Sequence, residues 1–123
     1  MEHQPLLVMG IDLGTSGVRV ALINENKDLV HLNEMSYENG LEDWKDWSRC
    51  CTKLINQIPP SLRRNLAGCA VDGTSGTLLA CKQNGRPISN ALAYNISFPE
   101  HKELLSRIIP DGSIAGNVDS SLA

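Results

Sequence analysis

The residues of this chain that are best suited to chemistry lie in a short stretch near its start. An apolar run leads to a single acid, Asp12, and the residues of the turn that follows are Gly14, Thr15, Ser16 and Gly17. A tight turn bounded by glycines exposes backbone N–H groups, and the two hydroxyls add donors, so the turn makes a concavity that suits an anion. A carboxylate beside a phosphate repels it unless a divalent cation lies between them. The stretch therefore predicts a nucleotide-phosphate site with Mg²⁺ near Asp12.

An ordinary hairpin turn is the alternative interpretation of this stretch, because short motifs have many chance matches. Asp12 favours the functional interpretation. A carboxylate at the end of an apolar strand is expected to be buried, and a buried carboxylate is unfavourable unless it is paired or bound to a metal.

A second acid, Asp72, ends another short β-prone run, residues 66–71. If this run returns parallel to the first strand, the two acids lie at the carboxyl ends of neighbouring strands. Ligands of open α/β sheets bind in the crevice at that edge, so both acids would face one ligand. The alternative is that Asp72 only begins a turn, since Asp-Gly is a common turn pair.

Two segments carry a resemblance to a known family. Residues 10–19 (GIDLGTSGVR) resemble the first phosphate motif of the FGGY carbohydrate kinases, whose fold belongs to the actin, Hsp70 and hexokinase superfamily. A second match lies at residues 71–77 (VDGTSGT) and is followed by residues 91–95 (ALAYN). The DGTSG variant looks most like the branch that phosphorylates pentuloses, ribulose or xylulose.

The resemblance implies a reaction and the residues that bind its substrates. The reaction is transfer of the γ-phosphoryl group of ATP to a sugar hydroxyl, with ATP and Mg²⁺ as cofactors. The residues that it implies for the ATP phosphates are Gly14, Thr15, Ser16 and Arg19. Those that it implies for the sugar are Asp12, Asp72, Thr74 and Ser75, with Asp12 also beside the metal.

The resemblance also implies what this chain lacks. The general base of the family belongs to a later block, so it is expected beyond Ala123 and no catalytic residue is expected within these residues. The fragment alone is therefore expected to be inactive. Two other functions stay open: an actin- or Hsp70-like ATPase domain, and a non-catalytic truncated paralogue that binds sugar or a partner.

The hydrophobic pattern predicts the strands that position these residues. Three β-prone runs, residues 6–13, 18–23 and 29–37, predict an antiparallel meander, and residues 66–71 predict a parallel strand. With the resemblance, this pattern predicts an α/β fold: a partial ribonuclease H-like domain of the actin/hexokinase superfamily, with helices packed on the sheet.

One helix is predicted between the meander and the parallel strand. Its apolar stripe, at helical spacing, consists of Trp44, Trp47, Cys51, Leu54, Ile55 and Ile58. Asp43 is the predicted N-cap, Asp46 is expected near the positive helix end, and Arg49 is expected to face away from the sheet.

Farther along the chain, Asn84-Gly85 predicts a hairpin between residues 77–82 and 88–94. A short helix with Leu104, Leu105, Ile108 and Ile109 follows and ends at Pro110. We expect one incomplete N-terminal domain over residues 1–123, with a loose tail at 1–5 and a truncated polar tail at 111–123.

Bulk properties narrow the class of protein. The 123 residues suit one domain, and 41% hydrophobic with 20% charged residues is typical of a globular chain. A net charge of −3 gives no reason to expect nucleic acid, and no apolar run reaches the roughly 18 residues of a membrane span. The expected location is cytoplasmic. An incomplete sheet would leave an exposed edge, so either a homo-oligomer or a marginally stable chain is expected.

Overall fold

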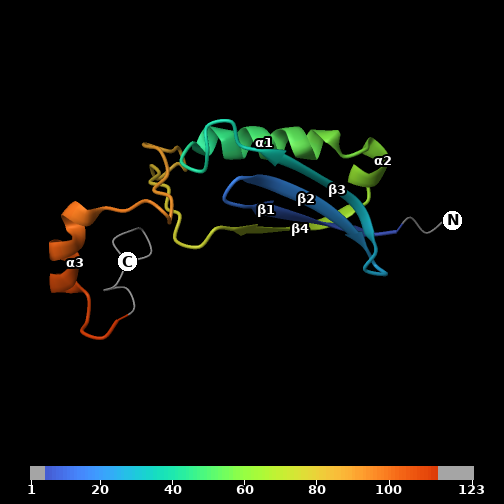
Figure 1. The fold of residues 1–123 in the computed structure, drawn as a ribbon. Helices are drawn as coiled ribbons and strands as arrows, with labels where there is room; N and C mark the ends of the chain where they lie inside the picture. The colour runs from blue at the N-terminus through green and yellow to red at the C-terminus, as the bar shows by residue number, and fades with distance from the viewer. Residues whose placement is uncertain (1–4, 114–123) are drawn as a thin grey trace. The chain divides into compact units, whose positions relative to one another are not determined.

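A computed structural model describes residues 5–113 of the chain (Figure 1). These residues form two compact units that divide between Gly73 and Thr74. The first unit contains a sheet and its main helix, and the second contains a bridged loop region and a short helix. The tails predicted at residues 1–5 and 111–123 lie largely outside the described residues.

The first unit is built on a four-stranded mixed sheet. Its strands are β1 (Leu7–Leu13), β2 (Gly17–Asn24), β3 (Leu29–Ser36) and β4 (Leu66–Gly73), and their order in the sheet is β3-β2-β1-β4. The first three pair antiparallel, and β4 pairs parallel with β1. The predicted meander and parallel strand are confirmed, although β4 continues through Asp72 to Gly73.

The core of this unit lies between one face of the sheet and helix α1 (Trp44–Gln57), which runs along that face in Figure 1. Alternate residues of β1 and β2 point toward the helix, because successive side chains of a strand point to opposite faces. The buried residues of this core are Leu7, Ile11, Val18, Val20, Leu22, Cys50, Leu54 and Ile58.

The ends of α1 follow from local chemistry. Asp43 is the N-cap as predicted, because its Oδ1 accepts a hydrogen bond of 3.0 Å from the N–H of Lys45. Ile58 is the C-cap, and Pro60 then begins the single turn of α2 (Pro60–Arg63). Proline suits this position because the first residues of a helix need no N–H.

The rotation of α1 differs from the prediction. The buried row of the helix is Asp46, Cys50 and Leu54, and it continues into Ile58, whereas Trp44 and Trp47 are only partly buried. Leu54 and Ile58 of the predicted stripe are confirmed as core residues, and Cys51 and Ile55 pack against the core. The stripe was wrong at Trp44 and Trp47 because it assigned the core only to apolar side chains. Asp46 occupies a core position because hydrogen bonds satisfy its carboxylate.

The second unit contains the predicted hairpin in a shortened form. Gly85 has a φ of +80°, and the N–H of Lys82 donates to the carbonyl of Arg86 at 2.8 Å, so the turn is present. The flanking segments meet only at isolated bridges, one of them at Pro87, where the missing N–H prevents a regular ladder. A 3₁₀ turn, η1 (Pro99–His101), leads into α3 (Lys102–Ile108).

No helix within residues 5–113 has the length and apolar content that a membrane crossing requires.

Candidate phosphate and sugar site

Four charged side chains form a row across the sheet. Asp12 on β1 lies opposite Arg19 on β2 and also opposite Asp72 on β4, and Arg19 lies opposite Glu34 on β3. Residues directly opposite each other share a face of the sheet, so the row lies on the face away from α1. The two acids are therefore neighbours at the carboxyl ends of parallel strands, which is the arrangement that the sequence predicted.

Asp12 is more exposed than expected. Its side chain is 47% exposed, so the expectation of a buried acid is wrong. The reason is that α1 packs on the opposite face of the sheet. Asp12 is nevertheless paired, because its Oδ2 accepts a hydrogen bond of 3.0 Å from Nη1 of Arg19, whose Nε donates to Glu34 at 3.3 Å. These two acceptors, Asp12 first, raise the pKa of Arg19, which keeps its charge.

Asp12 and Asp72 open into one hollow of about 380 Å³ on this face of the sheet. The uncharged residues that line this hollow are the small residues Gly10, Ala21 and Ala70 and the larger apolar residues Ile11, Leu32 and Val71. The carboxylate of Asp72 is partly oriented by its own chain, since the N–H of Gly73 donates to Asp72 Oδ1 at 2.9 Å.

The turn that joins β1 to β2 lines a second hollow, of about 520 Å³. The N–H of Gly14 closes the turn by donating to the carbonyl of Gly17 at 2.9 Å. Gly17 must be glycine, because a Cβ there would overlap the carbonyl oxygen of Met35 and lie 2.9 Å from Cα of Ser36. The residues that line this hollow are Gly14, Thr15, Ser16, Gly17, Val18, Arg19, Glu34, Met35 and Ser36. Arg19 lines both hollows.

Tyr37 holds the turn from the end of β3, and no role was predicted for it from the sequence. Its hydroxyl donates to the carbonyl of Gly14 at 3.1 Å, and its backbone N–H donates to the carbonyl of Ser16 at 2.9 Å. Burial, helped by the charges of nearby groups, raises the pKa of Tyr37 to about 12. The hydroxyl is therefore a stable donor at neutral pH.

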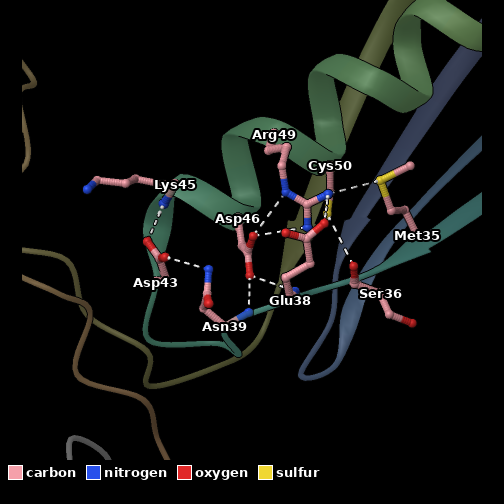
Figure 2. Close-up of polar contacts among 9 residues, drawn as sticks. All are labelled: Met35, Ser36, Glu38, Asn39, Asp43, Lys45, Asp46, Arg49 and Cys50. Atoms are coloured by element: carbon pink, nitrogen blue, oxygen red, sulfur yellow. Dashed lines mark hydrogen bonds and ion pairs between the residues drawn. The ribbon is translucent and has the colours of Figure 1, made fainter.

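Asp46 holds the segment that follows Tyr37, as Figure 2 shows. Its Oδ2 accepts hydrogen bonds from the N–H groups of Glu38 at 2.7 Å and Asn39 at 2.6 Å. Its Oδ1 accepts from Nε and Nη2 of Arg49 at 3.1 and 3.0 Å, and Arg49 also pairs with Glu38 at 3.0 Å. The Asn39 N–H is the leading cause that lowers the pKa of Asp46, against the opposing effect of burial. Asp46 lies four residues before Cys50 and eight before Leu54, so the three share one helix face. This spacing is the sequence signal that indicates a buried acid.

Thr74 and Ser75, the other predicted sugar contacts, begin the second unit. The hydroxyl of Thr74 donates to that of Thr77 at 2.7 Å, and the latter also accepts from the N–H of Tyr94 at 3.4 Å. Ser75 is exposed. Their roles toward a sugar stay predictions.

The acids of the row are compatible with a magnesium ion. Within the part of the chain that the structure describes, no three or more His, Cys, Asp or Glu side chains cluster as a full metal-ligand set. Mg²⁺ commonly takes only one or two protein carboxylates and completes its octahedron with water and phosphate oxygens. Asp12 and Asp72 fit that pattern, and the ion, when bound, would neutralise phosphate charge.

Comparison with known proteins gives the fold. No protein-family model matches the sequence. Among solved structures, the chain is similar to a xyloylose kinase from Brucella ovis, with a TM-score of 0.68 and 21% identity over 82% of this chain and 24% of that one. It is also similar to the xylulose kinase from Bifidobacterium adolescentis, with a TM-score of 0.64 and 20% identity over 94% and 24% of the two chains. The glycerol kinase of Plasmodium falciparum gives a TM-score of 0.59 and 15% identity over 86% and 24%.

The chain has the fold of the N-terminal domain of sugar kinases. The predicted fold class, a partial domain of the actin/hexokinase type, is confirmed. The chain spans about a quarter of the length of each of these three kinases.

Proposed function

We propose that the chain is the N-terminal part of an ATP-dependent carbohydrate kinase that transfers the γ-phosphoryl group of ATP to a hydroxyl of a sugar, with a pentulose as the preferred substrate. The observation that carries the proposal is that Asp12 and Asp72 lie opposite each other on neighbouring parallel strands, beside the glycine-bounded turn. The sugar-kinase fold supports it, as does the resemblance of residues 71–77 to the pentulose branch.

In this proposal the turn binds phosphate and the acids bind metal and sugar. Gly14, Thr15 and Ser16 contribute amides and hydroxyls to the ATP phosphates. Arg19, which lines both hollows, supplies positive charge between the turn and the acids. Asp12 and Asp72 hold Mg²⁺ and accept from sugar hydroxyls. For Thr74 and Ser75 it is the family resemblance that implies sugar binding, in which their hydroxyls would be short donors, each net contact contributing roughly 0.5–1.5 kcal/mol.

We also propose that these 123 residues bind substrates without turning them over. Phosphoryl transfer to a hydroxyl needs a group that accepts the proton of the hydroxyl. The family resemblance assigns that base to a later block, which is not among these residues.

The open edge of β4 further suggests that two copies associate through it.

Calorimetric titration of the full chain with MgATP, ribulose, xylulose and glycerol tests the binding proposal. We expect the pentuloses to bind more tightly than glycerol, and Asp72→Asn to weaken pentulose binding at least about tenfold. Asp28→Asn is the matched control, because Asp28 is an acid in the turn after β2 and away from the charged row. Absence of pentulose binding, or equal binding by Asp72→Asn, would contradict the proposal.

A coupled assay of ADP release tests the proposed lack of turnover. We expect no pentulose-dependent ADP release from the purified chain. Robust pentulose-dependent ADP release would refute the proposed lack of turnover. ATP consumption that does not depend on sugar would favour the ATPase alternative.

A further inference from the structure

We propose that Tyr37 is a positioning residue of the phosphate turn, residues 14–17, and that it shapes the turn for a polyphosphate. The inference deepens the proposed function and rests on it, since that function supplies the ligand of the turn.

Donors of the protein bind three backbone carbonyls of the turn. Tyr37 donates to two of its carbonyls, those of Gly14 and Ser16, and Gly14 donates to that of Gly17. A carbonyl oxygen that faces a phosphate repels it, whereas an N–H group attracts it. With these carbonyls engaged by donors of the protein, the turn is held in a form that favours an anion. The two contacts come from one residue, so its ring and backbone act together.

Tyr37 is itself held in place by the segment that follows it. The N–H groups of the next two residues, Glu38 and Asn39, both bind the carboxylate of Asp46 (Figure 2). Asp46 belongs to the buried row of α1, and its side chain is only 3% exposed. The turn is thus connected to the core helix through Tyr37, although neither Tyr37 nor Asp46 was expected to support the site.

The hydroxyl of Tyr37 makes a contact that one substitution can remove. Because it stays protonated across the neutral range, its hydrogen bond to Gly14 persists wherever the reaction would operate. Removing only this oxygen, by Tyr37→Phe, therefore isolates the contact and keeps the ring that packs against the core.

The test is a titration of the full ¹⁵N-labelled chain with magnesium pyrophosphate, followed through the amide signals of the turn. We expect Tyr37→Phe to bind pyrophosphate about fivefold more weakly, the effect of losing one ordinary hydrogen bond. We also expect faster amide exchange in the turn of this variant. Its affinity for a pentulose should be unchanged, which a general loss of structure would not permit.

Asn24→Ala is the matched control. Asn24 accepts from the N–H groups of Asn26 and Asp28 and so holds the turn at the opposite end of β2. Its removal should change stability without changing pyrophosphate affinity. Asp46→Asn is the second variant, and we expect it to weaken pyrophosphate binding in the same direction by loosening the segment after Tyr37.

The outcomes separate the two proposals. Equal pyrophosphate affinity of the wild type and Tyr37→Phe would overturn the role of Tyr37 and leave the kinase proposal intact. The same weakening in Asn24→Ala, or a parallel loss of pentulose binding in Tyr37→Phe, would also overturn it. If Tyr37→Phe does not fold, equal affinity of Asp46→Asn and the wild type overturns the role. A wild-type chain whose turn signals do not respond to pyrophosphate would instead contradict the proposed function.

Discussion

Arg19 lies between two carboxylates, and this arrangement defines the electrostatics of the site. The row across the sheet contains three acids, Glu34, Asp12 and Asp72, and one base. Arg19 pairs with Asp12 and Glu34, so Asp72 lies at the end of the row and, among residues 5–113, has no cationic partner. An excess of negative charge at that end favours a cation or a polyol over an anion, while the turn beyond Arg19 favours the anion.

At the same scale, Gly17 is required by its close approach to β3. We expect Gly17→Ala to destabilise the chain by about 1–3 kcal/mol, because the new methyl group must displace the backbone at Met35 and Ser36. Urea denaturation measures the change. Gly68→Ala is the control, since a Cβ at Gly68 meets nothing within 4 Å. Equal effects of the two substitutions would contradict the steric explanation.

The lowered pKa of Asp46 predicts how the stability of the chain depends on pH. Because its pKa is lowered in the folded chain from an ordinary value of 3.8, its contribution to stability is complete above that value and is lost as the pH falls below it. Asp46→Asn should therefore lower the melting temperature by roughly 4–8 °C at pH 6 and by clearly less at pH 3. Thermal melts of both proteins at the two pH values test this. A difference that does not depend on pH would show that the charge of Asp46 is unimportant, and Asp28→Asn serves as the surface control.

At the scale of elements, α1 has two functions in the fold. One face closes the core over β1 and β2, and its first turns hold the segment that leads from β3. Trp47 contributes at its edge by donating its indole N–H to the carbonyl of Leu41 at 2.9 Å. Since Trp47 is only partly buried, it is not the centre of the core that its place in the predicted stripe suggested.

Leu54 is the better test of how α1 packs on the sheet. We expect Leu54→Ala to lower the free energy of unfolding by about 2–5 kcal/mol, because the side chain is fully buried and its removal leaves a cavity. Leu104→Ala in α3 is the matched control, since Leu104 is 59% exposed and its truncation should change little. Chemical denaturation of the two variants compares them. A small effect at Leu54 would mean that α1 is not packed on the sheet as described.

At the scale of the whole molecule, the edge of β4 that faces away from β1 has no partner strand among the described residues. Val71 on this strand is 63% exposed, and an exposed apolar edge strand is a template for pairing with another chain. The association of copies proposed above would use this edge.

We therefore expect light scattering to show a mass that increases with protein concentration. Val71→Lys should shift the chain toward monomer, because a charged side chain on an edge strand opposes pairing. Leu104→Lys places the same charge on α3 and should leave the association unchanged. A wild-type chain that is monomeric at all concentrations, with a cooperative melt, would contradict the expectation.

Much of the fold could be predicted because it follows from local patterns. The alternation of residues 29–37, the cap at Asp43 and the small residues of the turn depend on neighbours in the sequence, so the strands, the start of the helix and the turn were predicted near their observed bounds. The alignment of Asp12 with Asp72 was also predictable. A strand that returns parallel after one helix brings its carboxyl end beside that of the first strand.

Only the tertiary structure showed which side chains support the site. Asp46 is buried because backbone N–H groups of residues 38 and 39 and the guanidinium of Arg49 converge on it, and no pattern of hydrophobicity reveals such partners. Likewise, Tyr37 and Gly14 are far apart in the sequence, and only the pairing of β2 with β3 brings them together. The sequence by itself determined the elements and their chemistry, whereas long-range hydrogen bonds, which depend on the assembled sheet, decided how the turn is held.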